Sequence, residues 1–223
     1  MAVVIKDLTK EYSRGGRIFK AVDSVCLTLA SGDFVSIIGK SGSGKSTILN
    51  MIAGLTIPTS GSVTFDDNEL FSLSDTEISK YRNLKIGYVP QGQSLLSKLT
   101  VLENVLLPYH MAEKPGDGAK TALSILEKVG ISHLSGSYPK HLSGGEMKRA
   151  AIARALINSP EILLVDEPTG DLDAQTTDDV LSLIKSAAES GTAVLMVTHD
   201  TDAVSYSNRR YEMRSGILIE SAK

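Results

Sequence analysis

The sequence predicts an α/β fold in which helices cover a parallel β-sheet. Residues 162–165 and 193–197 are short apolar runs, which are typical of strands buried on both faces. A helical pattern at about 174–189 separates them, and this alternation of strand and helix argues for a parallel sheet. Residues 1–38 read as further short strands separated by turns, so we expect an additional β region at the N-terminal end.

Caps and turns mark the remaining elements. Ser74 with Glu77, and Thr100 with Glu103, have the spacing of capping boxes, so a helix is expected to begin at each place. Gly130 is placed to end a helix. The other expected elements are, in chain order, strands at 3–5, 24–29, 33–38, 62–65 and 85–89, helices at about 45–53, 119–129 and 146–158, and a hairpin around 215–216. The middle of the chain is therefore predicted to be an inserted helical subdomain.

Composition excludes several classes of protein. The chain has 223 residues, of which 42% are hydrophobic, and 23 Lys and Arg against 26 Asp and Glu give a net charge of −3. Such a chain is expected to bury a core, and it lacks the basic excess typical of nucleic-acid binding. Its one cysteine, Cys26, excludes an intrachain disulfide or a Cys-rich zinc site, and its apolar neighbours predict a buried thiol.

No membrane-spanning segment or secretory signal is expected. The apolar runs, of which 193–197 is an example, are far shorter than the roughly 18 residues of a spanning helix. The first residues have no basic stretch before their apolar part, unlike a signal peptide. The expected compartment is the cytoplasm, and any link to a membrane must come through a partner.

A phosphate-binding loop is the clearest motif. Residues 39–46 (GKSGSGKS) match the pattern GxxxxGK[ST] and stand between a predicted strand and a predicted helix. Backbone N–H groups and the helix N-terminus attract phosphate there, Lys45 can reach the β- and γ-phosphates, and the Ser46 hydroxyl can ligate Mg²⁺. The residues expected to bind the nucleotide here are Gly39, Lys40, Ser41, Gly42, Ser43, Gly44, Lys45, Ser46 and Thr47.

Two carboxylates follow the apolar run 162–165. Ligands of open α/β sheets bind at the carboxyl ends of strands, so Asp166 is placed to hold Mg²⁺. Glu167 comes next and is the candidate group that orients or deprotonates the attacking water. The alternative interpretation is a simple turn after a strand. Because the chain also has a phosphate loop, the catalytic interpretation of the two carboxylates is the stronger one.

A second anion site is predicted at residues 142–146 (LSGGE). Ser143 and Glu146 have capping-box spacing, but a cap alone does not explain Gly144 and Gly145, which cost helix stability. Two glycines behind a capping serine leave N–H groups open to an anion at a helix N-terminus. The chain thus has two predicted anion-binding sites but only one phosphate loop. Both sites can bind the same nucleotide if they lie on opposite sides of it, across a dimer.

The segments GKSGSGKST, LSGGE and ILLVDEP resemble the motifs of ATP-binding-cassette (ABC) ATPases, and the resemblance covers nearly the whole chain. It implies one domain with a P-loop NTPase (RecA-like) core, a parallel sheet, an N-terminal antiparallel β region and an inserted α-helical subdomain. Residues 1–91 and 156–223 would form the core with the β subdomain, and 92–155 the helical subdomain with the signature helix. Two cassettes would enclose two ATP molecules head to tail. Glu146 departs from the family's usual glutamine and preserves the capping role.

Further roles follow from the resemblance, residue by residue. Gln91 matches the glutamine that senses Mg²⁺ and the attacking water, and His199 matches the histidine that contacts the γ-phosphate. Asp173 matches the aspartate loop that crosses the dimer interface, and it is also a good N-cap for the next helix. Tyr12 resembles the aromatic residue that stacks on adenine, and Phe19 is nearby in sequence.

Finer details resemble one branch of the family. Ser74-Asp75 ahead of Tyr81-Arg82, and the segments 99–105 and 166–173, are similar to the lipoprotein-release, macrolide- or peptide-export and cell-division ATPases, which usually have Asn at the position of Asp171. This implies ATP and Mg²⁺ as cofactors, a homodimer or paired cassette, and a separate membrane permease that holds the chain at the inner face of the cell membrane. A cell-division signalling ATPase and a soluble mechanical ATPase remain alternatives; LSGGE argues against a P-loop kinase.

Overall fold

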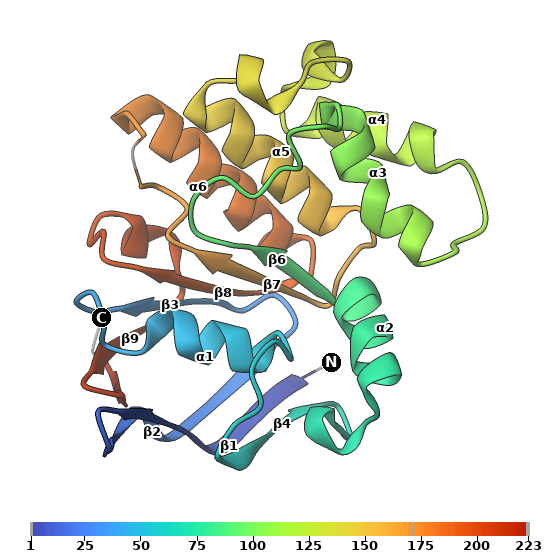
Figure 1. Cartoon of the computed structure of the whole chain (residues 1–223). Coiled ribbons are helices and arrows are strands. Elements are labelled where there is room, and N and C mark those ends of the chain that lie inside the picture. Colours follow the sequence, from blue (N-terminus) through green and yellow to red (C-terminus); the bar gives the residue numbers. More distant parts are fainter. Residues whose placement is uncertain (1, 171, 222–223) are drawn as a thin grey trace.

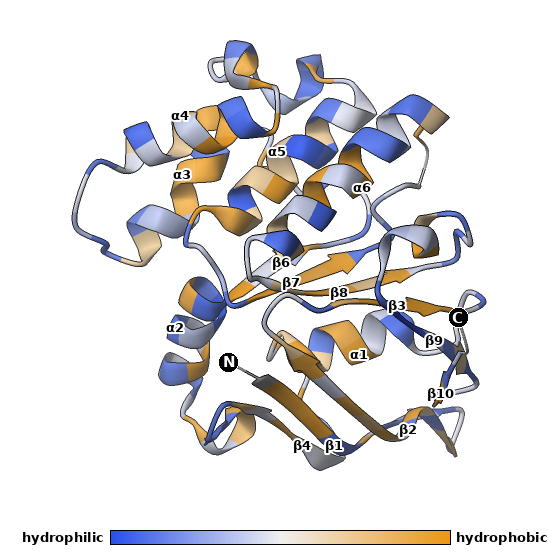
Figure 2. Ribbon diagram, turned by 180° about the vertical axis from the view of Figure 1, so that it is seen from behind, coloured by the Kyte–Doolittle hydropathy of each residue, from blue (hydrophilic) through white to orange (hydrophobic). Residues whose placement is uncertain are grey.

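Two β-sheets enclose helix α1 (Lys45–Ile52) in the computed structural model, which describes residues 2–170 and 172–221 (Figure 1). The larger sheet lies above α1 and the smaller one below it, and further helices cover the outer face of the larger sheet. This arrangement confirms the predicted α/β class with an antiparallel β region at the N-terminal end. Helix α1 and the strands on either side of it are rich in hydrophobic residues (Figure 2), and buried hydrophobic residues from these layers form one core cluster.

The larger sheet has six strands in the order β10-β9-β3-β8-β7-β6. Five strands are parallel, and β10 pairs antiparallel with β9. Every residue of β7 and β8 is buried, as expected of strands covered on both faces. The bounds are β3 (Phe34–Ile38), β6 (Ile86–Val89), β7 (Ile162–Asp166), β8 (Ala193–Thr198), β9 (Arg209–Arg214) and β10 (Ile217–Glu220). The carboxyl ends of β3, β6, β7 and β8 therefore meet along one edge.

The smaller sheet is antiparallel, in the order β2-β1-β4-β5. Its strands are β1 (Ala2–Arg14), β2 (Arg17–Ala30), β4 (Ser60–Phe65) and β5 (Asn68–Glu69). Along β2 the buried residues alternate with exposed ones, so Val25 and Leu27 face α1 while Cys26 points to solvent. The prediction of a buried thiol at Cys26 is therefore wrong, because a strand with one solvated face sends neighbouring side chains to opposite sides.

The remaining helices lie on the far side of the larger sheet or beside it (Figure 1). Their bounds are α2 (Asp75–Lys85), α3 (Val101–Met111), α4 (Gly118–Lys128), α5 (Gly144–Leu156) and α6 (Ala174–Glu189). Helices α5 and α6 pack on the sheet, whereas α3, α4 and one face of α5 share a separate apolar cluster. Capping boxes at Ser74 and Thr100 confirm the predicted helix starts. In the described part of the chain, no helix has both the length and the apolar character needed to cross a membrane.

Candidate nucleotide-binding site

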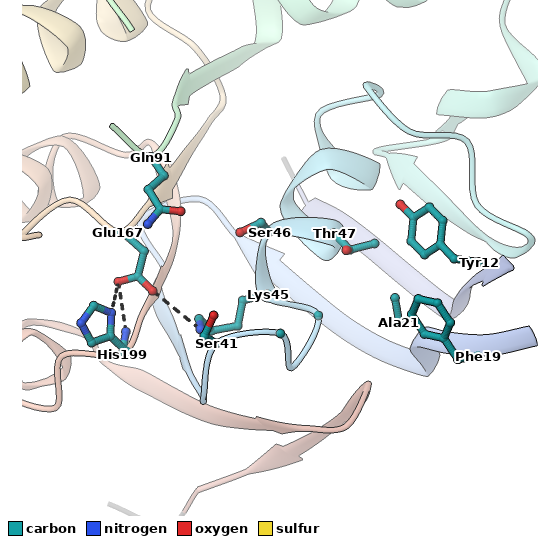
Figure 3. Close-up of a pocket in the computed structure, with 12 residues that line it drawn as sticks. Tyr12, Phe19, Ala21, Ser41, Lys45, Ser46, Thr47, Gln91, Glu167 and His199 are labelled. Atoms are coloured by element: carbon teal, nitrogen blue, oxygen red, sulfur yellow. Dashed lines mark hydrogen bonds and ion pairs between the residues drawn. The ribbon is translucent and has the colours of Figure 1, made fainter. Parts of the chain in front are cut away.

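A cavity of about 570 Å³ opens at the edge where the parallel strands end (Figure 3). It is bounded by the loop before α1, by residues that follow β6, β7 and β8, and by the β1–β2 hairpin. The residues that line it are Tyr12, Phe19, Ala21, Ser41, Gly42, Gly44, Lys45, Ser46, Thr47, Gln91, Glu167 and His199. Sequence-predicted residues from five separate segments thus lie around one space large enough for a nucleotide-sized ligand.

The loop between β3 and α1 forms one wall of this cavity. Gly44 has a φ of 111°, and a Cβ on it would lie 2.1 Å from the carbonyl oxygen of Ala21, so both conformation and space require glycine. Lys45 is 7% exposed, and its Nζ donates to the carbonyl oxygens of Gly39 at 2.7 Å and Lys40 at 3.3 Å. The loop therefore folds around its own lysine and holds the ammonium group at the cavity.

Helix α1 begins at this loop without a side-chain cap. Its N-cap is Gly44, and there is no acidic residue in the first turn. The first N–H groups of a helix have no partner inside the helix, and they carry the positive end of the helix dipole. The start of α1 can therefore bind a phosphate group, as the sequence motif predicts.

Glu167 is held by contacts of both its backbone and its carboxylate. Its φ is 48°, in the left-handed region, and its N–H donates to the carbonyl oxygen of Val197 at 2.9 Å. Carboxylate oxygen Oε2 accepts from the Thr198 hydroxyl and the His199 N–H, both at 3.1 Å, and lies 2.8 Å from His199 Nδ1. The other oxygen, Oε1, lies 3.6 Å from Lys45 Nζ (Figure 3). One carboxylate oxygen is thus fully bonded and the other faces the phosphate loop.

Asp166 is the last residue of β7 and is 4% exposed. Burial raises the pKa of its carboxyl above the ordinary value; a hydrogen bond from Ser46 opposes this, and the charge of Glu167 adds to it. Its Oδ1 is buried with no hydrogen-bond partner in the described part of the chain. A charged oxygen left without a donor fits a site for a hard cation, together with the Ser46 hydroxyl.

Three predicted residues lie at the mouth of the cavity. Gln91 is exposed and follows β6 by two positions, whereas the His199 side chain is 69% exposed and follows β8 directly. Tyr12 and Phe19 are opposite each other in the β1–β2 hairpin, with ring centroids 6.0 Å apart and planes tilted by 33°. The hairpin therefore presents two aromatic faces beside the phosphate loop.

The start of α5 does not line this cavity, although it has the features expected of an anion site. Ser143 is exposed and caps the helix in a full capping box with Glu146, which lowers the pKa of the Glu146 carboxyl through a hydrogen bond from the Ser143 N–H. The helix begins at Gly144, two residues before the predicted position. Gly144 borders a second hollow of about 480 Å³, which also reaches Gln91, Glu167 and His199.

Gly145 is buried for a packing reason that sequence spacing does not reveal. A Cβ at this position would lie 2.2 Å from Cγ2 of Thr176, so α5 approaches α6 too closely for any larger residue. Asp173 is the N-cap of α6 and accepts from the Thr176 N–H at 3.0 Å, which confirms the capping prediction. Asp171 lies outside the described residues.

The structure adds residues that the sequence predictions did not include. Phe19 and Ala21 line the cavity, and register across the hairpin could have identified Phe19 as the neighbour of Tyr12. Thr198 contacts Glu167, and Lys148 of α5 donates to the Glu167 carbonyl oxygen at 3.3 Å. No local pattern identifies these two, because their contacts depend on how β7, β8 and α5 pack. Conversely, Gly39, Lys40 and Ser43 belong to the loop but do not line the cavity.

Known proteins share this sequence and this fold. The family model described as "ABC transporter" matches residues 22–170. The chain is 40% identical over 217 residues to the lipoprotein-releasing system ATP-binding protein LolD of Geobacter metallireducens, with 96% of each protein covered. It is 38% identical over 221 residues to the macrolide export ATP-binding/permease protein MacB of Chlorobaculum tepidum, where it covers 99% of its own length and spans 34% of that protein.

Solved structures agree with these relatives. The chain matches the bacterial ABC transporter cassette MJ0796 in a dimeric structure, with a TM-score of 0.90, 38% identity and 99% of both chains covered. It matches the same cassette in a dimeric post-hydrolysis state bound to ADP and Pi with a TM-score of 0.90 and 39% identity. From the family match, the sequence identity and the shared fold, we conclude that the chain belongs to the ABC transporter family and is an ATP-binding-cassette ATPase.

Proposed function

We propose that this chain is the nucleotide-binding subunit of a transport system: two chains close on two Mg-ATP, hydrolyse them, and drive a separate membrane permease. The observation that carries the proposal is the exposed start of α5. Ser143 and Gly144 present a helix N-terminus suited to phosphate, yet they do not line the chain's own nucleotide cavity. A second chain placed head to tail would use them to close that cavity.

The residues around the cavity divide into binding and catalytic groups. Lys45 and the N–H groups at the start of α1 would hold the β- and γ-phosphates, and Tyr12 would stack on adenine. The Ser46 hydroxyl, Asp166 and Gln91 offer the oxygen ligands that Mg²⁺ prefers, and the unpartnered Asp166 Oδ1 supports this assignment. When bound, the cation would neutralise charge on the phosphates.

Glu167 is the candidate general base. The three donors on Oε2 hold the carboxylate in one orientation, and Oε1 remains directed toward Lys45 and the cavity. There it can accept the proton of a water that attacks the γ-phosphate. His199, bonded to Glu167 through Nδ1, would turn its other ring nitrogen to the phosphate.

The Glu167→Gln variant tests this assignment. The amide keeps the shape of the side chain but cannot take a proton, so steady-state hydrolysis should fall about a hundredfold or more while ATP binding persists. Because ATP then remains intact, the variant should accumulate as an ATP-bound dimer on a sizing column. Near-wild-type turnover by Glu167→Gln, measured as phosphate release, would remove Glu167 from its role.

The relatives support a role at a membrane. LolD is named as the ATP-binding protein of a lipoprotein-releasing system, and MacB as a macrolide export ATP-binding/permease protein. We infer export or extraction of a lipoprotein, peptide or drug, with this chain bound to the cytoplasmic face of the membrane through its permease. A permease should copurify with the tagged chain from gently solubilised membranes, and it should be lost after a high-detergent wash. Recovery of the chain without any integral membrane protein would contradict this part of the proposal.

A further inference from the structure

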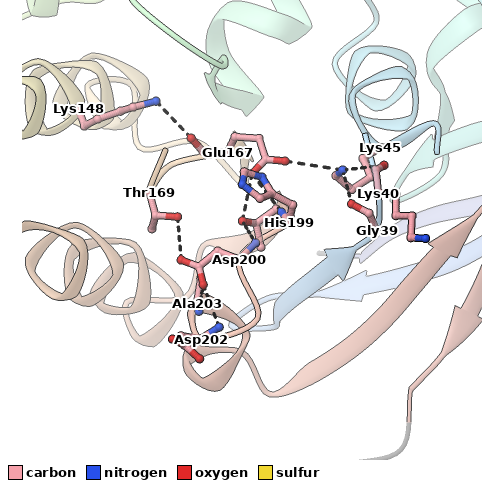
Figure 4. A network of polar contacts seen from close by, with 11 residues as sticks. Gly39, Lys40, Lys45, Lys148, Glu167, Thr169, His199, Asp200, Asp202 and Ala203 are labelled. Atoms are coloured by element: carbon pink, nitrogen blue, oxygen red, sulfur yellow. Dashed lines mark hydrogen bonds and ion pairs between the residues drawn. The ribbon is translucent and has the colours of Figure 1, made fainter. Parts of the chain in front are cut away.

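The loops that follow β7 and β8 are joined by a side-chain hydrogen bond outside the nucleotide cavity. The Thr169 hydroxyl donates to Oδ2 of Asp200 at 3.1 Å (Figure 4). Thr169 is 8% exposed and Asp200 is partly buried, and neither lines the cavity. The proposed function uses neither residue, although each is close in sequence to a residue with a proposed role, Glu167 and His199.

Asp200 is held in place by its own loop. Its Oδ1 accepts from the N–H groups of Asp202 at 2.9 Å and Ala203 at 3.4 Å, which leaves Oδ2 for Thr169. Its N–H donates to the Thr198 hydroxyl at 3.0 Å, and that hydroxyl donates to Glu167 Oε2 at 3.1 Å. An unbroken chain of hydrogen bonds therefore links Asp200 to the carboxylate of Glu167.

Thr169 lies on the loop after β7, close in sequence to Glu167, as Asp200 lies close to His199 on the loop after β8. It lies two residues after Glu167, whose φ of 48° is a conformation that non-glycine residues adopt only when their surroundings hold them there. The Thr169 carbonyl oxygen accepts from the Leu172 N–H at 3.3 Å, and the next residue, Asp173, is the N-cap of α6. Along the chain, Thr169 therefore lies between Glu167 and Asp173.

We propose that Thr169 and Asp200 are positioning residues that fasten the loop of Glu167 and Asp173 to the loop of His199, so that the three side chains keep their relative places. The pair acts through Glu167 and does not touch the nucleotide, and the proposal rests on the role of Glu167 given above. A hydroxyl that donates to an ionised carboxylate makes one of the stronger side-chain hydrogen bonds, which suits a link that sets geometry. A small displacement of a catalytic group lowers the rate of the chemical step strongly, whereas it affects substrate binding much less.

A double-mutant cycle with a matched control tests the pair. Thr169→Val removes the hydroxyl and keeps the shape, so kcat for ATP should fall about tenfold, the loss expected for one hydrogen bond to a charged group, while KM stays within about twofold. Thr169→Ser retains the hydroxyl and should keep near-wild-type kcat. In an Asp200→Ala background, which has lost the acceptor, Thr169→Val should lower kcat no further. Thermal midpoints of all variants check that each chain is folded.

Three results would overturn the proposal: a wild-type kcat in Thr169→Val, a Thr169→Ser variant as slow as Thr169→Val, or an equal effect of Thr169→Val with and without Asp200. If a variant fails to fold at the assay temperature, Thr169→Ser and Thr169→Val are compared at a lower temperature. That comparison still tests the proposal, because only Thr169→Ser retains the hydroxyl. Glu167→Gln is assayed in parallel. An active Glu167→Gln refutes the proposed function, whereas an inactive Glu167→Gln beside a fully active Thr169→Val refutes only the positioning pair.

Discussion

At the scale of single residues, the site contains buried charged side chains and a strained backbone conformation, which do not by themselves favour a stable fold. Asp166 and Lys45 are both buried, and Glu167 holds a left-handed backbone conformation. Burial is the main cause of the raised pKa of Asp166, so its negative charge is unfavourable at neutral pH when no cation is bound. Such features are typical of sites in which function is retained at the expense of stability.

Asp166→Asn should therefore stabilise the chain in the absence of nucleotide and metal. A carboxyl whose pKa is raised by folding contributes stability below its unfolded pKa, and that contribution is lost as the pH rises through the folded pKa. At pH 7 the variant should have a higher thermal midpoint than the wild type, and the difference should shrink below about pH 4, near the unfolded pKa of aspartate. The control is Asp67→Asn, which makes the same charge change at an exposed position. A lower midpoint for Asp166→Asn at pH 7 would contradict this account.

At the scale of elements, local signals predict where the helices begin but not why some residues are required. The capping boxes at Ser74, Thr100 and Ser143, and the Asp173 cap, were all predictable because a cap needs only sequence spacing. The close approach of Gly145 to Thr176 was not, because it depends on how α5 and α6 pack. The Thr169–Asp200 bond joins residues 31 positions apart and leaves no local signal either.

Gly145→Ala should test the helix contact. The added Cβ meets Thr176 Cγ2 at 2.2 Å, so overpacking should lower the free energy of unfolding by about 1–3 kcal/mol. Gly144→Ala is the matched control, because its Cβ would meet only Leu172 Cδ2, at 3.4 Å, and should leave stability nearly unchanged. Thr176→Ser removes Cγ2 and keeps the hydroxyl that bonds Asp173, so it should recover much of the loss in Gly145→Ala. Urea unfolding measures the three single variants and the Gly145→Ala/Thr176→Ser double variant, and equal stability of the two alanine variants would contradict the packing argument.

At the scale of the whole molecule, the two helix starts that the sequence predicts to bind anions lie on one chain, but only one of them lies at the nucleotide cavity. Helix α1 begins at the cavity, and α5 begins at an exposed surface. The α/β class and the two glycine-rich helix starts could be predicted from the sequence, because glycine-rich loops and buried strands are local patterns, whereas anion binding at each start stays a prediction. Their separation on the folded chain required the structure. Under the proposed function, each chain then supplies half of two composite sites.

Ser143→Arg should separate binding from assembly. The bulky cation at the exposed start of α5 lies away from the chain's own cavity, so single-chain ATP binding should persist, whereas ATP-dependent dimerisation should be lost. Ser143→Ala is the control, because it removes the helix cap, at a cost of about 1 kcal/mol, without adding bulk. Sedimentation with and without ATP reports the mass. A dimer that Ser143→Arg forms as readily as the wild type would contradict the head-to-tail arrangement.

The dependence of ATPase rate on chain concentration tests the central claim most directly, because it asks whether one chain can complete the reaction by itself. If two chains share each site, phosphate release per chain should rise with protein concentration at low concentration and level off once the ATP-bound dimer predominates. Activity per chain that stays constant across concentrations at which the protein is a monomer in the presence of ATP would contradict the claim, since a single cavity would then contain every group that hydrolysis needs.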